Sequence, residues 1–255
     1  MRLLGALQLG LKALLAPQTC GMCDRWVLNH RLIPLCDTCR AGLIRITGPV
    51  CHYCGTPLPG SLLENLARCS SCRDHPPVPL IRRSWGLYEG DLRELIHLYK
   101  FQPLKRLAWP LSQMLFQGLE AGFSDLQFDW IVPVPSHPAR VRERGFDAVG
   151  LLAKRLSEQT GIPVCSGVSR SRRTAPQLGL GRVERALNVK GAFHIRDGRI
   201  RVRGSLLIVD DILTTGTTVF ELASALQRQG RVEHMAALTI ARTPLWAGSR
   251  QSISS

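Results

Sequence analysis

The 255-residue chain has no uncharged apolar run that approaches the about 18 residues a membrane-spanning helix needs. Its longest candidate run, residues 107–119, is short and contains a proline. Acidic residues are also scarce, because 19 Asp and Glu stand against 33 Lys and Arg, a formal net charge of +14. The apolar content of 45% excludes a disordered chain. We therefore expect a soluble, cytoplasmic protein without a membrane span.

Two common nucleotide-binding motifs are missing as well. The sequence contains no Gly-Lys-Ser/Thr of a P-loop and no Gly-x-Gly-x-x-Gly of a dinucleotide-binding fold. The surplus positive charge is concentrated, because residues 137–205 hold 15 basic and 5 acidic side chains. Such a block binds polyanions or phosphates, or forms a well-solvated surface.

Eight of the nine cysteines form four Cys-x-x-Cys pairs in the first third of the chain. The pairs are Cys20/Cys23, Cys36/Cys39, Cys51/Cys54 and Cys69/Cys72. Two residues between thiolates let a tight turn present both sulfurs to one tetrahedral Zn²⁺, and four sulfurs complete its shell. The spacing predicts two structural Zn²⁺ sites in tandem ribbons, and it leaves a cross-braced pairing open.

Other uses of these cysteines fit the sequence less well. A disulfide framework requires an oxidising compartment, and nothing after the cysteines has a secreted character. Iron–sulfur clusters also take four thiolates, but their cysteine pairs are usually denser. Zinc-bound thiolates would bring the basic segment 1–80 close to neutrality. We interpret His52 and His75 as surface residues or neighbours of the metal ligands, and the lone Cys165 as a buried apolar residue.

Leucines recur at helical spacing before the cysteines and predict an amphipathic helix over residues 1–17, which Pro17 ends. The start resembles a signal peptide, but Lys12 interrupts the apolar run and no small-x-small cleavage site follows. We expect this helix to pack on the protein, with a signal or a membrane-surface anchor as alternatives. The predicted organisation is this helix, a double zinc ribbon over 18–75, a larger domain over 80–243 and a tail over 244–255.

Strand and helix patterns alternate after a proline-rich linker at residues 75–79. Strands are predicted near 83–88, 128–134, 205–209 and 234–241, and helices near 91–99, 104–119, 148–159 and 217–229. Pro110 is expected to kink or break the second of these helices. The alternation predicts an α/β fold, a mostly parallel sheet with flanking helices, in which ligands bind at the carboxyl ends of the strands.

The clearest strand, residues 205–209, leads into the acidic pair Asp210 and Asp211 and then into a Thr-rich turn at residues 214–218. Two carboxylates at a strand end can hold sugar hydroxyls or a Mg²⁺ shell. A turn that opens a helix offers N–H groups, hydroxyls and the positive end of the helix dipole to a phosphate, and Gly216 permits close approach. The pattern predicts a sugar-phosphate site, with a helix N-cap beside surface acids as the alternative.

Residues 206–218 resemble the phosphoribosyl-diphosphate signature of the type I phosphoribosyltransferases. The chain as a whole is similar to the ComF family, through its four cysteine pairs and through Arg144-Gly145-Phe146-Asp147, Gln177, Arg185, Asn188 and Phe193. That family is associated with DNA uptake in competent bacteria. Two departures are visible, Asp147 where the family usually has Asn and a near match around Gln177. The resemblance implies a type I phosphoribosyltransferase fold preceded by a small double zinc ribbon.

The resemblance also implies roles for individual residues. Asp210 and Asp211 would bind the ribose hydroxyls of phosphoribosyl diphosphate in the presence of Mg²⁺. The 5-phosphate would be wrapped by Thr214, Thr215, Gly216, Thr217 and Thr218. The pyrophosphate side would be formed by Pro135, Ser136, His137, Arg140, Arg142 and Arg144. A hood over the site would contain Arg170, Arg172, Arg173 and Gln177.

Two functions follow as hypotheses. The first is a Mg²⁺-dependent phosphoribosyltransferase-like enzyme with an unknown acceptor, in which cations assist the departure of pyrophosphate and a hood excludes water. His137 is a weak candidate for a general base in that reaction. The second is a non-catalytic protein that holds single-stranded DNA beside DNA-uptake or recombination proteins, with the fold as a nucleotide-sensing scaffold.

Overall fold

The computed structural model describes residues 18–27, 35–59, 68–74, 80–102, 104–170, 191–195, 203–229 and 231–244. The expected N-terminal helix, the linker 75–79 and the tail after residue 244 lie outside these residues. So do the single residues His75, Arg172, Arg173, Gln177, Arg185 and Asn188. No helix in the described part of the chain combines the length and the apolar character that crossing a bilayer requires.

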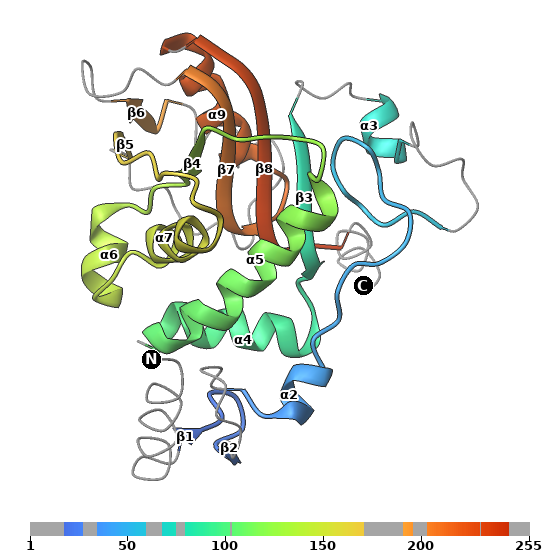
Figure 1. Ribbon diagram of the computed structural model, residues 1–255, viewed down its shortest axis with the longest axis vertical. Helices are drawn as coiled ribbons and strands as arrows, with labels where there is room; N and C mark the ends of the chain where they lie inside the picture. The colour runs from blue at the N-terminus through green and yellow to red at the C-terminus, as the bar shows by residue number, and fades with distance from the viewer. Residues whose placement is uncertain are drawn as a thin grey trace, which may run out of the picture.

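A four-stranded parallel sheet with the strand order β3-β8-β7-β4 forms the centre of the molecule (Figure 1). Its strands are β3 (Ile81–Leu87), β4 (Trp130–Pro133), β7 (Arg203–Leu213) and β8 (Arg231–Arg242). All four expected strands are present. Strands β7 and β8 are longer than predicted, because they pair with each other from Arg203↔Arg231 to Leu213↔Arg242.

Helices cover both faces of this sheet (Figure 1). They are α4 (Gly90–Phe101), α5 (Ala108–Gly122) and α7 (Ala148–Thr160) on one side and α9 (Thr217–Gln229) on the other. Leu207 and Val209 pack into the first layer, whereas Leu206 and Ile208 pack into the α9 layer. Both faces of β7 are therefore buried, which explains its continuous apolar run.

The helix expected over 104–119, with a kink or break at Pro110, is divided ahead of Pro110 rather than at it. A short 3₁₀ helix, η1 (Lys105–Leu107), precedes α5, and Pro110 is the third residue of α5. The N–H groups of a helix's first turn have no partner within the helix, so proline is tolerated there. Helix α7 ends as predicted, because Gly161 follows it in the left-handed conformation with a φ of +77°.

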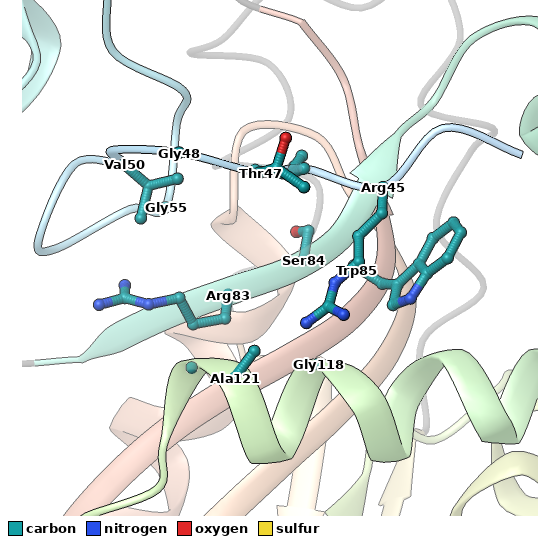
Figure 2. Close-up of a pocket in the computed structure, with 12 residues that line it drawn as sticks. Arg45, Thr47, Gly48, Val50, Gly55, Arg83, Ser84, Trp85, Gly118 and Ala121 are labelled. Atoms are coloured by element: carbon teal, nitrogen blue, oxygen red, sulfur yellow. The ribbon is translucent and has the colours of Figure 1, made fainter. Parts of the chain in front are cut away.

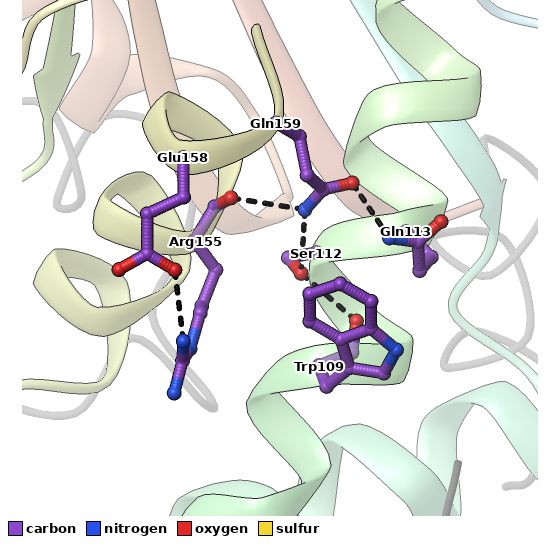
Figure 3. Close-up of polar contacts among 6 residues, drawn as sticks. All are labelled: Trp109, Ser112, Gln113, Arg155, Glu158 and Gln159. Carbon is purple, nitrogen blue, oxygen red and sulfur yellow. Dashed lines mark hydrogen bonds and ion pairs between the residues drawn. The ribbon is translucent and has the colours of Figure 1, made fainter. Parts of the chain in front are cut away.

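Polar side chains join α5 to α7 (Figure 3). Gln113 Nε2 donates to Gln159 Oε1 at 2.7 Å, and Gln159 Nε2 donates to Ser112 Oγ at 3.0 Å. Ser112 Oγ in turn donates to the carbonyl of Trp109 at 2.8 Å. This chain of bonds satisfies polar groups at the crossing of two helices that otherwise pack through apolar residues.

The remaining elements are short. Strands β1 (Gln18–Thr19) and β2 (Trp26–Val27) form one antiparallel pair, and β5 (Val168–Arg170) and β6 (Phe193–Ile195) form another. Short helices are α2 (Asp37–Ala41), α3 (Ser70–Asp74) and α6 (Pro138–Arg144). In Figure 1, β1, β2 and α2 lie near α4, whereas α3 lies beside β3. Sequence reasoning did not predict α6, β5 or β6.

Candidate functional site

The acidic pair lies within the last residues of β7 rather than after it. Asp210 pairs with Thr239 of β8, and the strand continues to Leu213. Asp211 is buried and Asp210 is partly exposed. The N–H of Asp211 donates to Asp210 Oδ1 at 2.9 Å. The backbone of the sheet therefore holds both carboxylates rigidly at its carboxyl edge.

Lys100 is the site residue that sequence reasoning missed. Its Nζ lies 2.7 Å from Asp211 Oδ2, and both side chains are largely buried, with 17% and 10% exposed. Lys100 stands in the last turn of α4, where a cation commonly complements the helix dipole. That ordinary position gave no signal, because the contact with Asp211 spans 111 residues of sequence.

The charges around Asp210 set its protonation. Burial of the carboxyl group and then the charge of Asp211 raise the pKa of Asp210. The positive charges of Lys100 and Arg170 lower it, but the raising effects dominate and the pKa is about 7. A carboxyl with this pKa changes its charge close to neutral pH, which is a property common at functional sites.

The Thr-rich turn connects β7 to α9. Thr214 is exposed, Gly216 is buried, and the hydroxyls of Thr215 and Thr217 lie 2.8 Å apart. Gly216 has a φ of +80°, and a Cβ added there would lie 2.9 Å from Arg82 Nη1. Only glycine fits this position without strain or displacement of a neighbour. Thr218 lies in the first turn of α9.

The predicted pyrophosphate side follows β4. Val134 N–H donates to the carbonyl of Val209 at 2.8 Å, which ties this segment to β7. Pro135, Ser136 and His137 are partly exposed and lead into α6. His137 Nδ1 accepts a hydrogen bond from the N–H of Ala139 at 3.1 Å, so this ring caps α6.

Four of the predicted arginines fall among the described residues. Arg140 and Arg144 are partly exposed and Arg142 is exposed, all on α6. Arg170 ends β5, and burial lowers its pKa, while Asp210 raises it and Arg140 lowers it. The structure therefore brings Arg170 into electrostatic range of both Asp210 and Arg140. The other predicted hood residues lie outside the described part.

The cysteines form two separate clusters. One contains Cys20, Cys23, Cys36 and Cys39, and the other contains Cys51, Cys54, Cys69 and Cys72, each with its sulfur atoms within 4.8 Å of one another. A tetrahedral Zn²⁺ with Zn–S bonds of about 2.3 Å would place its sulfurs about 3.8 Å apart. The Sγ atoms of Cys54 and Cys69 lie 3.6 Å apart. The tandem pairing is thus confirmed, and both donor sets fit Zn²⁺.

The protein surroundings favour one thiolate in each cluster. Burial raises the pKa of Cys20, but the N–H groups of Cys36 and Met22 outweigh it and the pKa falls to about 6. In the second cluster, the contact with Cys51 lowers the pKa of Cys54 to about 3. The pKa values of Cys39, Cys51 and Cys72 are instead raised, so each cluster combines a thiolate, the metal-binding form, with thiols that a cation would have to deprotonate. Cys165 is buried away from them, as predicted.

A cavity of about 310 Å³ lies between β3, α5 and the segment that follows α2 (Figure 2). It is bounded by the segment around Arg45 and Thr47, by Arg83 and Trp85 of β3, and by α5 near Gly118. None of the residues that line it belongs to the acidic pair or to the Thr-rich turn. The cavity marks the junction between the second cysteine cluster and the sheet.

Solved structures of phosphoribosyltransferases show a partial likeness to the chain. An adenine phosphoribosyltransferase is 16% identical, with a TM-score of 0.38 over 58% of this chain and 76% of that chain. An orotate phosphoribosyltransferase from Aeropyrum pernix is 17% identical, with a TM-score of 0.30 over 53% of this chain and 58% of that chain. The predicted α/β class, a mostly parallel sheet with flanking helices behind a double zinc ribbon, is confirmed.

Sequence comparisons cover almost the whole chain. Residues 11–74 match the model of the double zinc ribbon domain. "DNA utilization protein YhgH" of Salmonella typhimurium is 33% identical over 85% of this chain and 94% of that protein. "Competence protein F" of Haemophilus influenzae is 28% identical over 82% of this chain and 90% of that protein. With this identity extending across both parts of the molecule, the chain belongs to the ComF family of competence and DNA utilization proteins.

Proposed function

We propose that the protein binds phosphoribosyl diphosphate with Mg²⁺ at the carboxyl edge of the sheet and takes part in DNA uptake. The supporting observation is one continuous segment in which Asp210 and Asp211 lie in the last residues of β7 and the Thr-rich turn leads into α9. Lys100 and Arg170 supply positive charge beside the pair. The role in DNA uptake is suggested by the names of the relatives.

The two carboxylates have different tasks in this proposal. Asp211 is already engaged by Lys100, so its charge is balanced within the protein. Asp210 is more accessible and offers its oxygens to a ribose hydroxyl. N–H groups of the turn and of the first residues of α9 hold the 5-phosphate. Carboxylate oxygens also suit Mg²⁺, which would neutralise charge on the pyrophosphate.

The proposed reaction transfers a phosphoribosyl group. The bond between C1 of the ribose and the pyrophosphate oxygen breaks, and its electron pair leaves with the pyrophosphate. A lone pair of the acceptor then forms the new bond to C1, and the proton that the attacking N–H or O–H group carried passes to water. In this proposal Ser136, which follows β4, and Arg140 of α6 stabilise the negative charge that accumulates on the leaving group.

Calorimetry tests the proposal directly. The zinc-loaded chain is titrated with phosphoribosyl diphosphate, with and without Mg²⁺, and compared with the double variant Asp210→Asn/Asp211→Asn. We expect binding only by the unmodified chain, and stronger binding with Mg²⁺. An absence of heat in the unmodified chain, or equal binding by the double variant, rejects the proposal. Release of pyrophosphate in the presence of candidate acceptors, above the rate of hydrolysis, then distinguishes turnover from occupancy.

Binding of single-stranded DNA is the second candidate. It is supported by the surplus of ten positive charges between residues 137 and 205 and by the exposed position of Arg142 on α6. Binding through phosphates weakens steeply with salt, because condensed counterions are released. We expect oligonucleotide affinity to fall as salt rises, and affinity that ignores salt contradicts this function.

A further inference from the structure

The second cysteine cluster is bonded to the edge of the sheet through three consecutive carbonyls. The carbonyl of His52 accepts from Arg83 Nη1 at 2.9 Å, that of Tyr53 accepts from the N–H of Arg82 at 2.8 Å, and that of Cys54 accepts from Arg242 Nη1. Strands β3 and β8 therefore hold the turn between two of the predicted metal ligands.

One of these arginines also contacts the Thr-rich turn at residues 214–218, and another pairs with the last residue of the strand before it. The Arg82 guanidinium lies 4.5 Å from the centre of the Phe220 ring in α9. Its Nη1 lies against Gly216, where it would be 2.9 Å from an added Cβ. The backbone of Arg242 pairs with Leu213, the last residue of β7 before the turn. Each arginine thus contacts the cluster with one part and the turn, or the strand leading to it, with another.

Both arginines are buried without an acidic partner. Arg82 is 6% exposed and Arg242 is 4% exposed. Within the part of the chain that the structure describes, no carboxylate forms an ion pair with either, and the Nε of each lacks a hydrogen-bond partner. Burying unpaired charges is costly, so a counter-charge is expected nearby.

The loaded cluster would supply that counter-charge. Four thiolates around Zn²⁺ carry a net charge of about −2, which matches two guanidinium groups. The first cluster differs, since its Cys23 is exposed and no described hydrogen bond links its cysteines to β3 or β8.

We propose that Arg82 and Arg242 are positioning residues that couple the second cysteine cluster to the turn at residues 214–218. Zn²⁺ in the second cluster, and not in the first, holds this turn in place. The consequence for ligand affinity rests on the proposed function, but the coupling itself is a property of the chain. It is therefore measured without phosphoribosyl diphosphate.

Hydrogen exchange of the zinc-loaded full-length chain tests the coupling. We expect amides in residues 214–220 to exchange about tenfold faster in Arg82→Met, because the turn opens more often. Arg83→Met is the matched control: Arg83 also bonds the cluster at His52, but its guanidinium lies toward Phe123. It should leave the turn unchanged, and Arg82→Lys should preserve most of the protection. Equal exchange in Arg82→Met and the unmodified chain overturns the proposal.

Metal release provides the second measurement. Arg242→Met is expected to weaken Zn²⁺ binding about tenfold at one site of two, because it removes a partner from the shell around the ligands. When a chelating dye removes Zn²⁺ from this variant, one of the two Zn²⁺ ions per chain should be released faster than from the unmodified chain, and the other at the same rate. Two unchanged release rates overturn the proposal. A chain that shows the coupling but binds no phosphoribosyl diphosphate would reject the proposed function and leave this inference intact.

Discussion

Replacing Gly216 with alanine tests the packing of the Thr-rich turn. The φ of +80° at this position costs a residue with a Cβ about 1–2 kcal/mol. The new Cβ would also lie 2.9 Å from Arg82 Nη1 and 3.3 Å from Phe220 Cε2. Arg82 cannot move aside freely, because its guanidinium is buried and stacked on Phe220. We expect Gly216→Ala to lower the free energy of unfolding by about 2–3 kcal/mol.

Gly161→Ala is the matched control for this experiment. Gly161 has nearly the same φ, +77°, but nothing lies within 4 Å of its added Cβ. It therefore reports the backbone cost alone, about 1–2 kcal/mol. Urea denaturation of both variants gives the two free energies, and their difference isolates the contact with Arg82 and Phe220. Gly216→Ala that is no more destabilising than Gly161→Ala would refute the described packing.

Three further predictions follow from the site and the core. Because burial, and then Asp211, raise the pKa of Asp210 to about 7, its ionised form is disfavoured in the folded chain. Its contribution to stability therefore falls as pH rises from about 4 to about 7. Ribose hydroxyls prefer the ionised form, so phosphoribosyl diphosphate affinity should rise through about pH 7; pH-independent calorimetry contradicts this. Leu207→Ala should lower the free energy of unfolding by about 2–5 kcal/mol in urea, because Leu207 is fully buried. Leu126 is half-exposed, so Leu126→Ala should lower the free energy of unfolding by less than about 0.5 kcal/mol. Similar losses in the two variants would contradict the burial of Leu207 in the core. Lys100→Met should lower the free energy of unfolding by about 2–4 kcal/mol, because it leaves the buried charge of Asp211 without a partner. Adding Asp211→Asn should recover part of this loss, and no recovery would argue against the pair.

Much of the fold was predictable because it is encoded locally. Residues 206–209 are uniformly apolar, and such a run is typical of a strand covered on both faces. The predicted helix over 217–229 matches α9 at both ends. Pro110 was misread, because a proline in a first turn and a proline in mid-helix look alike until the helix start is known. Helix α6 was not predicted, because its seven residues show no apolar periodicity.

The candidate site was predictable in part. The acidic pair and the turn are contiguous in sequence, so their pattern was visible, although β7 extends through the pair. Lys100 could not be found this way, because its partner Asp211 comes from a distant strand. The same holds for Arg82, whose position beneath Gly216 arises only when β3 joins the sheet beside β8.

The amino-acid sequence alone determined the metal-ligand candidates and the candidate sugar-phosphate site, because cysteine spacing and a strand followed by acids and threonines are local patterns. It also determined the alternation of strands and helices, since hydrophobic periodicity is local too. Only the tertiary structure decided which cysteine pairs share a cluster, which cation balances Asp211, and that Arg82 and Arg242 lie between the second cluster and the turn. Those are contacts between distant segments, and they arise from the packing of the strands into one sheet.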